Sequence, residues 1–295
     1  RRNDLAEYVV PLVEGEDVRD YLVDAPGYLI FPYDKSTAAV LEALPPALAN
    51  HFWFYRRSLK VRKDFGNYIE DLGLRWYVHS MFFPERFRSA LGLPFAFVAT
   101  HNHFVLDRGG KVFNRSAPVV QLRAGSSEEV HQGTLGVLNS SVACFWMKQV
   151  FYPKGGDQIG GEGARVSASP WEDRYEFAAT GMKDFPVPPR MPTTLAKRID
   201  ALARDISTMH PRSLFSDNRV SSRDVLTAAQ SETVSLRRRM IAAQEELDWQ
   251  CYHLYGLLPE SSEAMYLESA TVPELALGER AFEIVLARRI AAGDE

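Results

Sequence analysis

Positive charge is concentrated in one short stretch of the sequence. Five cations fall within eight positions, and no acidic residue occurs from residue 45 to residue 63. The five are Arg56, Arg57, Lys60, Arg62 and Lys63. Such a group can neutralise phosphates along a nucleic-acid backbone. A basic helix face that meets only water is an equally good interpretation.

The apolar residues around these cations recur with a helical period. This period predicts a helix over about residues 46–63, and Pro46 suits its first turn. Arg56, Lys60 and Lys63 then share a face beside the apolar one. The apolar positions are Leu48, Phe52, Tyr55 and Leu59.

Signatures of catalysis are missing from the sequence. It has no G-x-S-x-G or H-E-x-x-H motif and no paired-acid nuclease pattern. An acidic or amide residue followed by Pro-Pro and an aromatic would hold an adenine amino group, but the nearest strings, at 44–47 and 187–190, lack both flanking residues. We therefore predict that the chain is not catalytic by itself. The alternative is an enzyme with a site that these motifs do not reveal.

Metal and phosphate sites are also not indicated. The histidines are scattered, and the pair His101 and His103 lacks further ligands at a fixed spacing. The glycine-rich segment 153–171 follows a helix and lacks a nucleotide-binding register, so we interpret it as a surface loop. Cys144 and Cys251 lie in apolar helical patterns, which favours buried thiols in a reducing compartment.

One stretch, residues 113–151, is expected to organise the chain. A strand over 113–122 with a turn at 114–116 leads into a helix capped by Ser126 or Ser127. This single helix is apolar on most faces to its end and is therefore expected to be buried nearly all round.

The remaining patterns predict an α+β fold: a mixed β-sheet with packed helices over residues 1–190, then an α-helical region over 191–295. Helices are expected at 36–44, 195–206, 222–255 and 272–292. Strands are expected within 5–33 and at 76–78, 81–83, 95–100, 104–106 and 174–180, with an irregular link at 64–73.

The net charge is −4, so any nucleic-acid contact would have to be confined to the basic stretch. No apolar run reaches the length of a membrane span. We expect a cytoplasmic protein without a membrane partner. The missing initiator methionine suggests a piece of a longer protein.

Several segments resemble a known family. They are YLIFPY at 28–33, VFNRSAPVVQL at 112–122, LGVLNSSVACFWMKQV at 135–150 and FPVP at 185–188. Together with the basic helix, they resemble the target-recognition region of large single-chain adenine-specific DNA methyltransferases of the bacteriophage-exclusion and phage-growth-limitation type, known as PglX. The resemblance covers most of residues 1–190 and, more loosely, the helices that follow.

The resemblance implies a target-recognition domain in a phage-defence system that binds double-stranded DNA. It also implies an S-adenosylmethionine-dependent, adenine-N6-specific catalytic domain N-terminal to this chain, so no cofactor is expected here. Other defence proteins are further candidate partners. Polar residues on turns would read base edges, since Asn and Gln fit adenine and Arg and Lys fit guanine. The candidates are Asn102, His103, Arg115, Lys148, Gln149 and Lys154.

An interaction module that docks other defence subunits without touching DNA is the alternative function. In that case the basic helix and the long helix would both bind protein.

Overall fold

The computed structural model describes residues 3–154, 173–215, 222–258 and 275. Short strands and helices precede a pair of long helices, so the predicted α+β class with a helical C-terminal region is confirmed. Except for residue 275, the expected helix at 272–292 lies outside the described residues, as does nearly all of the glycine-rich segment.

The strands are β1 (Val9–Val13), β2 (Val18–Arg19), β3 (Leu22–Val23), β4 (Gly27–Ile30), β5 (Lys63–Asp64), β6 (Asn67–Tyr68), β7 (Leu93–Pro94), β8 (Val98–Ala99), β9 (Val112–Phe113), β10 (Val119–Val120) and β11 (Tyr175–Glu176). The helices are α1 (Pro46–Lys60), α2 (Pro84–Arg88), α3 (Glu128–Leu138), α4 (Ser141–Val150), α5 (Ala179–Met182), α6 (Thr193–Met209), α7 (Pro211–Leu214) and α8 (Arg223–Leu254). The 3-10 helices are η1 (Asn3–Tyr8) and η2 (Gly15–Asp17).

A three-stranded sheet supports the N-terminal part of the fold. Its central strand, β1, pairs antiparallel with β4 and parallel with β9. Val10 of β1 and Phe31, the residue after β4, are buried in one cluster with Leu48 and Phe52 of α1. The sheet therefore holds the N-terminal half of α1 against the core.

Residues 92–107 double back on themselves through backbone hydrogen bonds. The amide of Ala96 donates to the His103 carbonyl at 3.2 Å, and the amide of Val105 donates to the Pro94 carbonyl at 3.0 Å. The expected continuous strand at 95–100 is wrong, because β7 pairs with β10 while β8 pairs with β11. Two different partners require a change of direction between these short strands.

The expected single helix after residue 127 is wrong, since the chain forms α3 and α4 instead. Ser127 caps α3 as predicted, and Ser140 caps α4 by accepting from the Ala143 amide. Between the helices, the Asn139 side chain accepts from the Phe104 amide and donates to the Phe104 carbonyl, both at 2.9 Å. These two hydrogen bonds, between residues far apart in the sequence, fix the break between α3 and α4. Phe145 of α4 is 69% exposed. Of the two helices, only α3 is therefore buried on nearly all of its faces.

Helices α6 and α8 pack along each other with a continuous apolar seam, as their periods predict. Helix α3 packs across α6, and a Cβ on Gly136 would lie 2.7 Å from Cβ of Ala196. Buried polar groups also cross this contact, because Gln132 donates to Asp200 at 3.1 Å. The division of the chain at residue 190 stays a prediction.

Other local expectations are wrong. Residues 36–44 form turns, because the Asp34 carboxylate accepts from the amides of Ser36 and Thr37 and so replaces a helical start. The link at 64–73 contains the β5–β6 hairpin. The segments 76–78 and 81–83 are not strands, although Tyr77 and Val78 do belong to the core.

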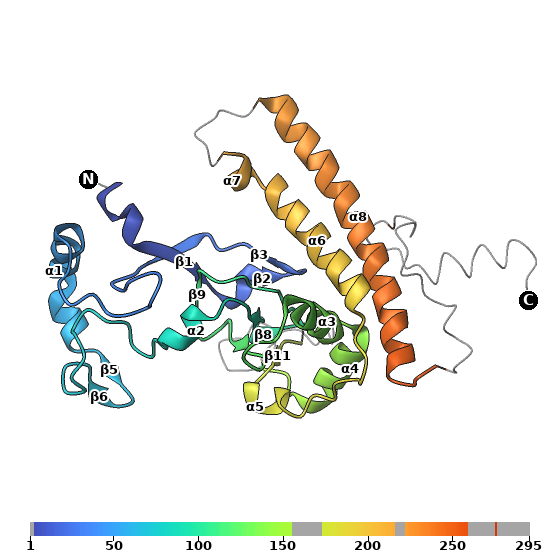
Figure 1. Cartoon of the computed structure of the whole chain (residues 1–295), viewed down its shortest axis with the longest axis horizontal. Helices are drawn as coiled ribbons and strands as arrows, with labels where there is room; N and C mark the ends of the chain where they lie inside the picture. Colours follow the sequence, from blue (N-terminus) through green and yellow to red (C-terminus); the bar gives the residue numbers. More distant parts are fainter. Residues whose placement is uncertain (1–2, 155–172, 216–221, 259–274, 276–295) are drawn as a thin grey trace, which may run out of the picture.

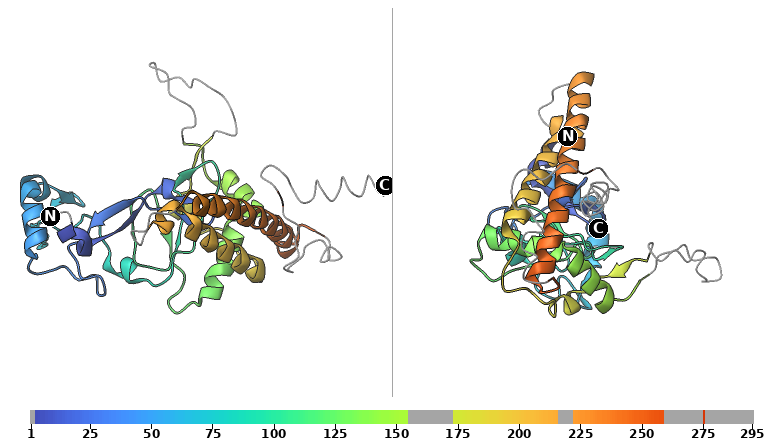
Figure 2. Two further views of the ribbon diagram at one scale, coloured as in Figure 1. Left: turned by 90° about the horizontal axis from the view of Figure 1, so that it is seen from above. Right: turned by 90° about the vertical axis from the view of Figure 1, so that its right-hand side faces the viewer.

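The molecule is elongated (Figures 1 and 2). Helix α1 and the β5–β6 hairpin lie at one end, which we call the tip and define as residues 46–68. Helices α4, α6 and α8 lie toward the other end, as Figure 1 and the left-hand view of Figure 2 show. Any site on the tip is thus separated from the helical region by the body of the sheets.

Candidate functional site

The tip exposes more aromatic surface than an ordinary solvated helix. Residues 53–58 of α1 are all exposed, so this part of the helix meets solvent on every side. Trp53 is 64% exposed and Phe54 is 85% exposed. Tyr55, expected on the apolar face, is 54% exposed. Contiguous exposed aromatic residues of this kind mark interaction surfaces.

Cations lie among these aromatic side chains. The Arg56 guanidinium lies 4.9 Å from the centre of the Trp53 ring, and the Lys63 ammonium lies 4.8 Å from that of the Tyr68 ring. Arg57 is exposed on the same helix. Positive charge held over aromatic faces suits a ligand with both phosphates and flat bases.

The other two predicted cations have partners within the fold. Lys60 lies 2.9 Å from the Glu70 carboxylate. The Arg62 guanidinium donates to the carbonyls of Leu59, Trp76 and Val78 at 2.7 to 3.1 Å. Burial lowers the pKa of Arg62 from its ordinary value. Arg62 therefore ties the end of α1 to the core, which is a different role from the expected phosphate contact.

The β5–β6 hairpin adds a feature that the sequence patterns missed. Two residues, Phe65 and Gly66, connect the strands, and both have positive φ, at 47° and 88°. The Phe65 side chain is 75% exposed. The string Asp64-Phe65-Gly66-Asn67 lacks the usual Asn-Gly signal of such a turn. Only Gly66 matches the residue that these turns favour at their second central position.

The predicted base-reading residues do not gather in one place. Asn102 donates to the Leu138 carbonyl at 2.6 Å and so supports the turn between α3 and α4. His103 lies near Asp20, at 3.9 Å. Burial and the nearby Arg19 lower the pKa of His103 to about 4, so its ring is neutral at pH 7. Both side chains line a cavity, described below, rather than a convex surface.

The remaining candidates lie elsewhere. Lys148 and Gln149 belong to α4, toward the end of the molecule opposite the tip (Figure 1). Lys154 pairs with Glu176, and Lys148 lies 5.5 Å from the centre of the Tyr175 ring. Arg115 is exposed in the turn between β9 and β10. The structure thus brings Asn102 and His103 together at a cavity whose lining includes Ser141 and Cys144 of α4, and it separates this pair from the tip.

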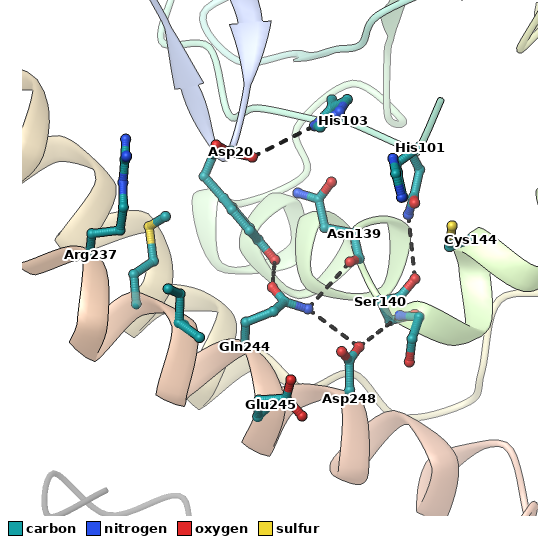
Figure 3. A pocket seen from close by; sticks show the side chains of 15 residues that line it. Asp20, His101, His103, Asn139, Ser140, Cys144, Arg237, Gln244, Glu245 and Asp248 are labelled. Atoms are coloured by element: carbon teal, nitrogen blue, oxygen red, sulfur yellow. Dashed lines mark hydrogen bonds and ion pairs between the residues drawn. The ribbon is translucent and has the colours of Figure 1, made fainter. Parts of the chain in front are cut away.

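A cavity of about 530 Å³ lies between α8, the α3–α4 turn and residues 101–103 (Figure 3). Gln244 is central to its hydrogen bonds: it accepts from the Tyr21 hydroxyl at 2.6 Å and donates to Asp248 at 3.3 Å. The amide of Ser141 donates to the same Asp248 oxygen at 2.7 Å. Burial raises the pKa of Asp248 to about 6. These bonds join α8 to the α3–α4 turn, which gives the polar lining a structural role.

Within the described ranges, no cluster of three or more His, Cys, Asp or Glu side chains is placed to hold a metal ion. None of the helices in those ranges has the length and apolar character needed to cross a membrane.

Fold and surface together define an α+β chain with a cationic, aromatic tip at one end and, toward the other, a helical hairpin made of α6 and α8. A family model described as a domain of unknown function, DUF7008, matches residues 240–295. Over its whole length the chain is 46% identical to the adenine-specific methyltransferase PglX of Streptomyces coelicolor, of which it covers 24%. The chain is therefore a PglX-type region, about a quarter as long as this relative.

Proposed function

We propose that this chain recognises DNA for an adenine-N6-specific methyltransferase of a cytoplasmic anti-phage defence system. The observation that carries the proposal is the tip, where Arg56, Arg57 and Lys63 lie among exposed aromatic side chains. The similarity to an adenine-specific methyltransferase supports a substrate that contains adenine bases.

The charge of the tip favours a polyanion. Of the acidic residues close to it, Glu70 pairs with Lys60. Asp64 is buried and accepts from the Met81 amide at 3.0 Å. Arg56, Arg57 and Lys63 therefore dominate the exposed charge of α1 and β5. We propose that these three contact the phosphate backbone, while Lys60 and Arg62 shape the end of the helix.

Methyl transfer itself would be performed outside this chain. S-adenosylmethionine sites need a glycine-rich turn that leads from a strand into a helix, and the described residues offer none. We propose that the cofactor and the flipped adenine are held by an N-terminal methyltransferase domain of the same parent protein. Base reading by Arg115 or by the residues of α4 would require the DNA to pass along the body of the molecule.

The test is fluorescence anisotropy of the chain on a duplex DNA across a salt series. Arg57→Glu with Lys63→Glu should weaken binding and lower the log-log salt slope by at least about 1.8, because each lost phosphate contact removes about 0.9. The matched control is Lys183→Glu with Arg190→Glu, which reverses one lysine and one arginine exposed away from the tip. Equal losses in both variants, or no binding at low salt by a folded chain, would contradict the proposal.

A second candidate function is docking of another protein on the helical hairpin. A groove of about 900 Å³ lies between α6, α8 and the segment around the β2–β3 hairpin, and Glu16, Asp17, Asp20 and Asp24 contribute to its lining. Arg19 and Arg237 also line the groove, and Asp24 pairs with Arg212 at 3.1 Å, so Glu16, Asp17 and Asp20 are the carboxylates that would attract a basic segment of a partner. Binding of basic defence-system subunits that survives reversal of the tip cations would favour this function.

A further inference from the structure

The hairpin at the tip carries a bulky side chain where turn chemistry disfavours one. A two-residue connection with positive φ at both positions is the type I′ pattern, which strongly favours Asn-Gly, Asp-Gly or Gly-Gly. Gly66 meets this preference, but Phe65 does not, because a Cβ in the left-handed region crowds the following carbonyl. The backbone at Phe65 is thus strained.

The strain is not offset by burial of the ring. Phe65 is 75% exposed, so the phenyl group gains little from the hydrophobic effect in the free chain. Strained residues that the fold does not use for packing are concentrated at functional sites. An exposed aromatic ring on a tight, two-residue turn has the shape of a wedge.

The surroundings of the ring match duplex DNA better than an apolar partner. Lys63, two residues before it, lies over the exposed Tyr68 ring on the paired strand. Arg56 and Arg57 project from the adjoining helix. A wedge flanked by cations is the arrangement by which proteins insert apolar side chains between base steps while holding the phosphates on both sides.

We propose that Phe65 inserts between two stacked base pairs of the bound duplex and unstacks them, with Lys63 on the adjacent phosphate. The ligand of this site is a deformable base step, and pyrimidine–purine steps such as TA unstack most easily. The inference rests on the proposed DNA recognition and adds to it a source of sequence preference that needs no hydrogen bond to a base edge.

The test compares binding of the 295-residue chain to two duplexes of equal length, one with several TA steps and one made of A-tracts. The TA duplex should bind about tenfold more tightly, because a TA step costs less to unstack than a step of a stiff A-tract. A 2-aminopurine placed in a TA step should also brighten when the chain binds. Phe65→Asn should remove both the preference and the fluorescence rise. Because Asn-Gly suits a type I′ turn, this variant should melt at the same temperature or higher.

Two further variants sharpen the result. Phe65→Leu should keep most of the preference, since leucine also serves as a wedge. Phe145→Ala removes a phenylalanine that is 69% exposed on α4 and should leave both readouts unchanged.

The two proposals fail in distinguishable ways. If Phe65→Asn binds both duplexes as the unchanged chain does, with the same salt slope, the wedge is overturned and DNA recognition stands. If the unchanged chain binds neither duplex, both proposals fall together.

Discussion

The protonation of Asp248 is linked to the folding of the chain. Burial raises its pKa to about 6, and Glu245 on the same helix adds to the shift. Between about pH 4 and pH 6 the folded chain therefore holds a proton that the unfolded chain has released. This carboxyl group stabilises the fold less as the pH rises through that window, and it stays charged and partly buried above it.

Asp248→Asn should consequently stabilise the chain at high pH. The amide oxygen can still accept from the Ser141 amide, while the charge is removed. We expect the free energy of unfolding to rise by about 1 to 2 kcal/mol near pH 8, after allowance for residual contact with solvent, and to change little near pH 4. Urea unfolding at the two pH values measures this. Asp71→Asn, at an exposed position, is the control, and an equal gain at both pH values would contradict the linkage.

Helix α3 packs closely against α6 and α8. A Cβ on Gly136 would meet Ala196, Leu247 and Pro192 at 2.7, 3.1 and 3.2 Å, so the contact with α6 and α8 depends on the missing side chain. The close approach places the α3–α4 turn against α8, where Asn139 and Ser141 meet Gln244 and Asp248. The packing at Gly136 thus positions the α3–α4 turn and α8, which line the cavity of about 530 Å³.

Gly136→Ala should therefore destabilise the chain. Overpacking costs about 1 to 3 kcal/mol, and the better helix propensity of alanine returns up to about 1 kcal/mol, so a net loss of about 1 to 2 kcal/mol is expected. Thermal and urea unfolding measure the loss. Val130→Ala, at an exposed position of the same helix, should stay within about 0.5 kcal/mol. A neutral Gly136→Ala would mean that α6 and α8 can move away from α3.

For the whole molecule, the separation of its ends decides how DNA can bind. The tip lies at one end and α4 toward the other (Figure 2). A short duplex held by Arg57, Lys63 and Phe65 would leave α4 untouched, whereas a longer duplex could run along the body toward Arg115.

Hydrogen exchange with and without DNA tests this geometry. With a short duplex we expect slower exchange in residues 46–68 and no change in α4, because protection follows the surface that the ligand covers. Protection of α4 without protection of the tip would place the DNA on the opposite end and contradict the proposed interface.

The sequence by itself determined the features that depend on neighbours along the chain. The apolar periods of α6 and α8, the cap at Ser127 and the start of α1 at Pro46 were all predictable. Helix period and capping are local properties, set by side chains within one or two turns. The cluster of cations in the tip was visible for the same reason.

Tertiary structure alone decided which of those side chains remain exposed to a ligand and which bond within the fold. Arg62 turns inward because carbonyls at residues 76 and 78 lie within its reach, and the break before α4 exists because Asn139 bonds to Phe104. The β5–β6 pairing turns Phe65 into an exposed tip residue. Each of these contacts joins groups whose proximity depends on how the chain folds back on itself, and a pattern of neighbouring residues does not encode that proximity.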